Sequence, residues 1–94
     1  MDREASLELL NATHEFPCAF TLKVIGESSD DFIERCLAAV KSTNLVAGQI
    51  PVSSRSTPKG RHMSVTMTPE LASAEDVLIV YEALRTVEGV VMTM

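Results

Sequence analysis

Residues 61–68 constrain the fold most, because apolar and polar side chains alternate there from His62 to Thr68. The two sets are Met63, Val65 and Met67, and His62, Ser64, Thr66 and Thr68. Successive side chains of a strand point to opposite faces of its sheet, so the pattern predicts a strand with one buried face and one polar face. Residues 20–26 alternate in the same way and predict a second strand of this kind, ended by Gly26.

Two helices are predicted between the strands from capping residues followed by apolar stripes. Ser28 precedes Asp31 by three residues, and Ser73 precedes Asp76 by three, which is the pattern of a helix start. The helices would run to about residues 42 and 86. Residues 46–52 and 90–94 predict two further strands, and Pro51 assigns the first of these to a sheet edge, where a missing N–H is tolerated.

The resulting order, βαββαβ, predicts an α+β fold of the ferredoxin-like type. Right-handed crossovers would give a four-stranded antiparallel sheet in the order 4-1-3-2 with two helices on one face. Residues 13–94 would form this domain. Residues 1–12 would be an extension, either a short helix over residues 3–11 or a disordered segment.

Charge is unevenly distributed along the chain, and this limits the classes of partner. The formal net charge is −5, which argues against nucleic acid or an anionic membrane as the partner. No apolar run approaches the 18 residues of a membrane span. Two cysteines without a secretory signal predict a reduced, cytoplasmic setting. Residues 53–62, in contrast, contain three cations and no acid.

That basic segment is predicted as a loop and as a candidate site for a small anion. Its candidate ligand-binding residues are Ser53, Ser54, Arg55, Lys59, Gly60, Arg61 and His62. Hydroxyls, cations and backbone N–H groups near a glycine suit a phosphate or a carboxylate. The alternative is a solvated hairpin loop, rich in serine and proline because turns are.

The polar face of the two alternating strands is a second candidate surface, exposed because both helices cover the other face. Lys23, Ser64 and Thr66 would lie on it and contact a partner protein or a second copy of the chain. RNA binding on such a face needs aromatic side chains for base stacking, and these positions have none.

Catalytic and metal-binding patterns are absent from the sequence. Cys18 and Cys36 lie too far apart for a metal-binding pair, and Cys36 falls on an apolar helix stripe that predicts a core position. His14 and His62 have no neighbouring nucleophile or second ligand. We therefore expect neither a cofactor nor a metal, and no enzymatic activity.

Two blocks of the chain resemble a known family. Residues 14–26, HEFPCAFTLKVIG, resemble the opening E-F-P-x-x-F-x-x-K-V-x-G of the YbeD-like family. Ser53-Ser54 followed by residues 59–65, KGRHMSV, resembles its second block, S-S-x-G-x-Y-x-S-V. This chain has four extra residues, 55–58, between the serine pair and Lys59, and His62 and Met63 depart from the family pattern.

The resemblance implies a ferredoxin-like fold similar to amino-acid-binding regulatory (ACT-type) domains, and it supplies no settled activity. In ACT-type domains a glycine-containing turn after the first strand helps to receive the ligand, which here would be Gly26 with Ser28 and Ser29. The simpler interpretation is that Gly26 permits the turn and Ser28 caps the helix. The leading hypothesis is a regulatory module that senses a small anionic metabolite, and the alternative is a protein-interaction adaptor using the open sheet face or an edge strand.

Overall fold

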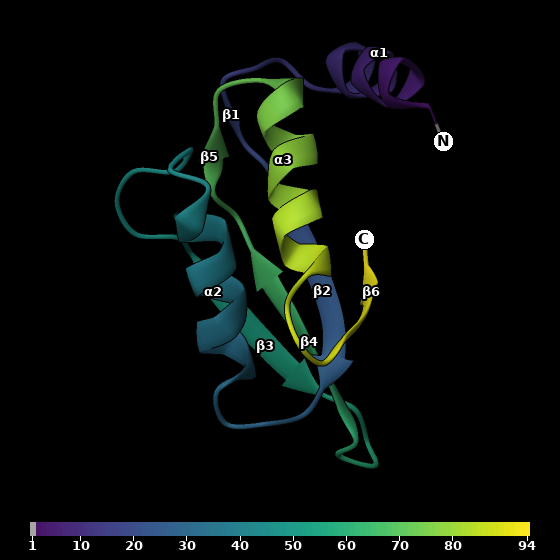
Figure 1. Ribbon diagram of the computed structural model, residues 1–94, viewed down its shortest axis with the longest axis vertical. Coiled ribbons are helices and arrows are strands. Elements are labelled where there is room, and N and C mark those ends of the chain that lie inside the picture. Colours follow the sequence, from purple (N-terminus) through teal and green to yellow (C-terminus); the bar gives the residue numbers. More distant parts are fainter. Residues whose placement is uncertain (1) are drawn as a thin grey trace.

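The computed structural model describes residues 2–94. Figure 1 shows its helices and strands along the chain. Their bounds are α1 (Arg3–Thr13), β1 (Cys18–Ala19), β2 (Leu22–Glu27), α2 (Phe32–Ser42), β3 (Val52–Ser56), β4 (His62–Met67), β5 (Glu70–Leu71), α3 (Ala74–Arg85) and β6 (Val90–Thr93).

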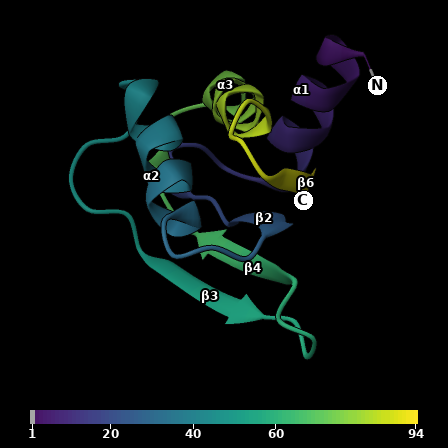
Figure 2. The ribbon, with the colours of Figure 1, turned by 60° about the horizontal axis from the view of Figure 1, so that its bottom comes forward.

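Four strands form one antiparallel sheet in the order β3-β4-β2-β6. Read from the other edge, this is the predicted order 4-1-3-2, so the predicted α+β, ferredoxin-like fold is confirmed. Figure 2 shows α2 and α3 on one side of the sheet and no helix on the other side. We refer to that uncovered side as the open face.

The core lies between the sheet and these two helices, and it follows from the alternation in the two central strands. Leu22, Val24 and Val65 point into it and are fully buried, whereas Lys23 is exposed. Phe32 of α2 and Val77 of α3 cover them from the helix side. The predicted division of β2 and β4 into a buried and a polar face is therefore confirmed.

The second strand of the sheet differs from the prediction in its position. It spans Val52–Ser56 rather than residues 46–52, and all five of its residues are exposed. Backbone pairing with β4 fixes this strand, and its own side chains bury little, so no apolar pattern marks it. Its predicted edge position is confirmed, and Pro51 lies just before it, with its carbonyl oxygen accepting from Thr68 N–H at 3.0 Å.

The starts of the two helices gave one wrong prediction and one correct one. Ser28 does not cap α2: the helix begins at Phe32, and its first flanking residue, Asp31, makes no side-chain capping bond. Ser73 does cap α3, because its hydroxyl accepts from Asp76 N–H at 3.2 Å. The two-residue strands β1 and β5, which pair with each other beside the main sheet, were not predicted.

The N-terminal helix α1 lies beside α3 at one end of the molecule (Figure 1). None of its residues is buried, and the exposed side chains of Arg3 and Glu82 meet at 3.5 Å between α1 and α3. Within residues 2–94, no helix is long and apolar enough to cross a membrane.

Candidate functional site

The strand register brings the predicted partner face and part of the predicted anion loop onto one surface. Directly paired residues of antiparallel strands lie on the same face, so each pairing across β3, β4 and β2 defines a row. One row is Ser53–Thr66–Lys23, and the next is Arg55–Ser64–Ile25. Both rows lie on the open face.

These two rows surround a shallow depression of about 370 Å³. Its lining residues are Lys23, Ser53, Ser54, Arg55, Ser64 and Thr66. Two cations and the hydroxyls of Ser53, Ser64 and Thr66 thus meet on the open face without a carboxylate among them. Ser54 is paired with Val65, so its side chain points to the other face of the sheet. The Ser64 hydroxyl donates weakly to the Arg55 carbonyl at 3.5 Å, so its single O–H would have to leave this long contact to donate to an anion. Such a set suits a small anion.

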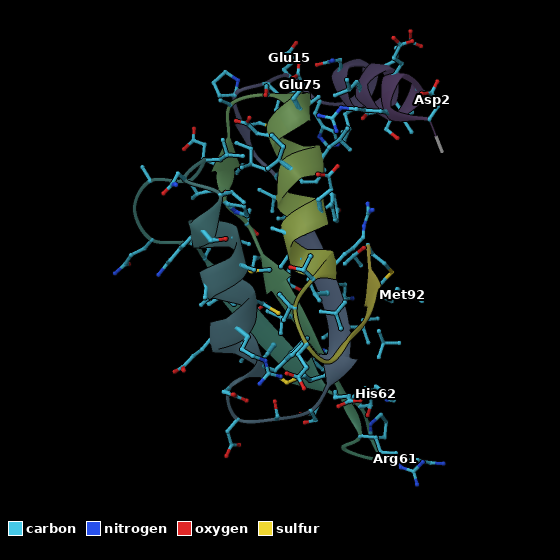
Figure 3. All side chains as sticks on the ribbon, viewed as in Figure 1. Asp2, Glu15, Arg61, His62, Glu75 and Met92 are labelled. Atoms are coloured by element: carbon cyan, nitrogen blue, oxygen red, sulfur yellow. The ribbon has the colours of Figure 1, made fainter. Side chains whose placement is uncertain are left out.

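The remaining residues of the predicted loop do not line this depression: Lys59, Gly60 and Arg61 lie at the tip of the hairpin between β3 and β4, and His62 is the first residue of β4. Gly60 N–H donates to the Thr57 carbonyl at 2.9 Å, and the φ of Gly60 is +71°, so a tight turn sets the tip. Figure 3 shows Arg61 at this end of the molecule with His62 close behind it. Lys59, Gly60 and Arg61 therefore do not join Arg55 in one loop site.

The nearest acid on the open face lies toward the hairpin. Glu27 is paired with His62 at the end of β2 and β4, and it is two residues beyond Ile25 on the same face. Neither Lys23 nor Arg55 forms an ion pair with any residue in the described part of the chain. Their charges are accordingly directed to solvent or to a ligand.

Gly26, predicted to end the first strand and to form part of the other candidate site, lies inside β2 and is paired with Met63, just before the turn that follows the strand. A Cβ at Gly26 would lie 2.2 Å from Phe32 Cζ and 2.7 Å from the Gly89 carbonyl oxygen. Gly26 is thus required by close packing rather than by a ligand-binding turn.

Arg35 holds the turn after β2 in place, a role that was not predicted, although its spacing four residues after Asp31 is typical of an ion pair on a helix. Its guanidinium contacts Asp31 Oδ1 at 2.6 Å, donates to the Ser29 hydroxyl at 3.4 Å and donates to the Glu88 carbonyl at 3.2 Å. The hydrogen bond from Arg35 lowers the pKa of the Asp31 carboxyl below its ordinary value, and the bond from Ser29 adds to this. These contacts tie the start of α2 to the turn before β6.

The two cysteines are both free and lie in different environments. Cys36 is fully buried in the core, as predicted, and burial raises the pKa of its thiol to about 11. Cys18 is half-buried on β1. Among residues 2–94 no three side chains of the metal-binding kinds gather in one place.

Comparisons with known sequences point to one family. The family model described as "Protein of unknown function (DUF493)" matches residues 11–94. A UPF0250 protein from Shewanella amazonensis is 33% identical over 86 residues, which cover 87% of this chain and 96% of that protein. Another from Shewanella woodyi is 37% identical over 76 residues, covering 81% and 84%.

Comparisons with solved structures agree with the fold. The solution structure of protein HP0495 from H. pylori has a TM-score of 0.72 at 12% identity and covers 86% of this chain and 85% of that one. The crystal structure of the ACT domain from GTP pyrophosphokinase of Chlorobium tepidum has a TM-score of 0.59 at 12% identity, covering 79% and 91%. At this identity the likeness concerns the fold alone.

Proposed function

The chain belongs to the DUF493 family of proteins of unknown function, and from that premise we propose that it is a non-enzymatic regulatory module that binds a small anionic metabolite on its open face. One observation carries the proposal: the register places Lys23 and Arg55 on neighbouring strand rows, with hydroxyls between them and no carboxylate in the depression. The fold shared with an ACT domain supports a regulatory role.

Binding rather than catalysis is proposed because of the groups that line the depression. They are an amine, a guanidinium and hydroxyls, with no imidazole, thiol or carboxylate to act as a general base near neutral pH. No cofactor or metal enters the proposal. A cytoplasmic location remains a prediction from the sequence.

Titration with inorganic phosphate and citrate, followed by ¹H–¹⁵N NMR, tests the anion site. Each probe should shift the amide signals of Lys23, Arg55 and Ser64, and the affinity should fall with added salt because charge supplies much of the attraction. Lys23→Gln and Arg55→Gln should each weaken binding by about fivefold to tenfold, the order expected for one charged hydrogen bond at an exposed site.

Lys41→Gln is the matched control, because it removes one exposed cation from α2, on the covered side of the sheet. It should leave the affinity unchanged. If Lys41→Gln weakens anion binding as much as Arg55→Gln does, the binding reflects only the net charge of the protein. The proposal fails if neither anion perturbs the open face.

A second candidate, self-association through a sheet edge, is favoured by the exposed apolar side chains of β6. Val91 is 61% exposed and Met92 is 50% exposed on this edge strand, and residues 89–94 carry no charged side chain. Figure 3 shows Met92 at the side of the molecule, on the outermost strand. Two acidic copies of the chain would meet there without opposing like charges.

Sedimentation equilibrium tests this second candidate. A dimer through β6 should be weakened at least tenfold by Val91→Lys, which places like charges across the pairing strands. Ile79→Lys, on the exposed side of α3, is the matched control and should leave the association unchanged. A monomer at all concentrations, or equal effects of the two variants, would rule the β6 dimer out.

A further inference from the structure

A second depression on the open face adjoins the anion site and has a different chemical character. It measures about 280 Å³ and is lined mostly by carbon atoms. Its lining residues are Lys23, Ile25, Arg55, Ser56, Thr57, Pro58, Met63 and Ser64. Lys23, Arg55 and Ser64 line both depressions, so the two are continuous across these residues.

The apolar wall of this second depression is held by the fold. Ile25 is half-buried on a central strand and is paired with Ser64. Pro58 stands in the hairpin turn, which is closed by the bond from Thr57 N–H to the His62 carbonyl at 2.9 Å. Figure 2 shows this hairpin extending beyond the body of the sheet at the end of β3 and β4. The wall is thus preformed next to the cations.

Resting on the proposed function, we infer that the ligand is an aliphatic carboxylate with a short hydrocarbon arm. The carboxylate would lie between Lys23 and Arg55, where the Ser53 and Thr66 hydroxyls complete the polar depression. The arm would lie along Ile25 and Pro58. Removing such an arm from water is favourable, and the depression is at the small end of ligand sites, which suits about four to six carbons in all.

Chain length and charge can be varied separately to test this inference. Acetate, butyrate and hexanoate share one carboxylate, so their affinities in the NMR titration compare the arm alone. From butyrate to hexanoate each methylene should tighten binding about twofold to fourfold, as expected for partial to full burial. Hexanol, which keeps the arm and lacks the charge, should bind far more weakly than hexanoate.

Paired variants assign the effect to the apolar wall. Ile25→Ser should lower the affinity for hexanoate at least threefold and leave that for inorganic phosphate unchanged, whereas Arg55→Gln should weaken both. Ile79→Ser, an equal change on α3, is the control and should affect neither. Pro58→Ala is an independent test at the opposite wall if Ile25→Ser perturbs folding, which circular dichroism reports.

The outcomes separate the inference from the function on which it rests. If phosphate binds but acetate, butyrate and hexanoate bind with equal affinity, the inferred aliphatic arm is wrong and the anion site still stands. Absence of binding by every anion would overturn both. Hexanoate binding that Ile25→Ser and Pro58→Ala leave unchanged would also refute the inferred wall.

Discussion

Replacing Gly26 with alanine should strongly destabilise the fold, because the space beside its Cα is occupied. The added Cβ would lie 2.2 Å from Phe32 Cζ, 2.6 Å from Phe32 Cε1 and 2.7 Å from the Gly89 carbonyl oxygen. Ordinary carbon contacts begin near 3.5 Å, so the Phe32 ring would have to withdraw by about 1.3 Å. That ring is fully buried, and the Gly89 carbonyl accepts from Glu27 N–H at 2.9 Å.

The cost follows from the rigidity of both neighbours. Overpacking a core typically costs about 1–3 kcal/mol, and we expect about 3 kcal/mol here, because neither an enclosed ring nor a paired backbone can move freely. For a domain of this size, that loss corresponds to a fall in Tm of roughly 12–24 °C. Urea unfolding followed by circular dichroism measures the free energy, and the m-value should stay unchanged.

Two controls separate packing from backbone strain. Gly48→Ala adds a Cβ where nothing lies within 4 Å but the φ is +79°, so it should cost only about 1–2 kcal/mol of conformational strain. Gly26→Ala should also cost clearly less when Phe32 is already leucine, because the two changes share one contact. The packing argument is refuted if Gly26→Ala lowers the free energy of unfolding no more than Gly48→Ala does. It is also refuted if the effect of Gly26→Ala is undiminished in the Phe32→Leu background.

Three further predictions concern single groups. Because Arg35 lowers the pKa of Asp31 in the folded state, this carboxylate stabilises the fold fully above about pH 4–5, near its unfolded pKa, and progressively less as the pH falls through its folded pKa. The urea midpoint of D31N should therefore fall less between pH 5 and pH 3 than that of the unaltered protein, and an equal fall would contradict this. Cys36, with its pKa raised to about 11 by burial, should react with iodoacetamide at pH 8 much more slowly than Cys18, as mass spectrometry of the alkylated peptides would show. Faster labelling of Cys36 than of Cys18 would mean that the core opens readily. Ser73→Ala should cost about 1 kcal/mol in urea unfolding, because one N–H of α3 loses its acceptor, and no loss would exclude the cap as a source of stability.

The sequence predicted the parts of the fold that rest on side-chain burial. Met63, Val65 and Met67 alternate with polar residues because β4 has one face in the core, and this pattern is visible without the structure. Strand β3 has no such face. It is held by backbone pairing to β4, so its serines resembled a loop and its position was predicted wrongly.

The site was only partly accessible to sequence reasoning for a related reason. Arg55 was predicted as an anion-site residue and Lys23 as a residue of the partner face. Their closeness depends on the register of β3 against β4 and β2, a property of pairings between distant segments. Arg35 was missed because its partners, Ser29 and the Glu88 carbonyl, come together only when the chain folds.

The weak attachment of α1 has a consequence for the kinetics of amide exchange. None of its residues is buried, and the ion pair that connects it to α3 joins two side chains that are each more than half exposed. Its N–H groups should therefore exchange with deuterium through a local opening of small free energy, whereas those of β2 and β4 should exchange only when the whole domain unfolds. The N-terminal helix would then open and close as its own cooperative unit, while the open face of the sheet keeps its geometry.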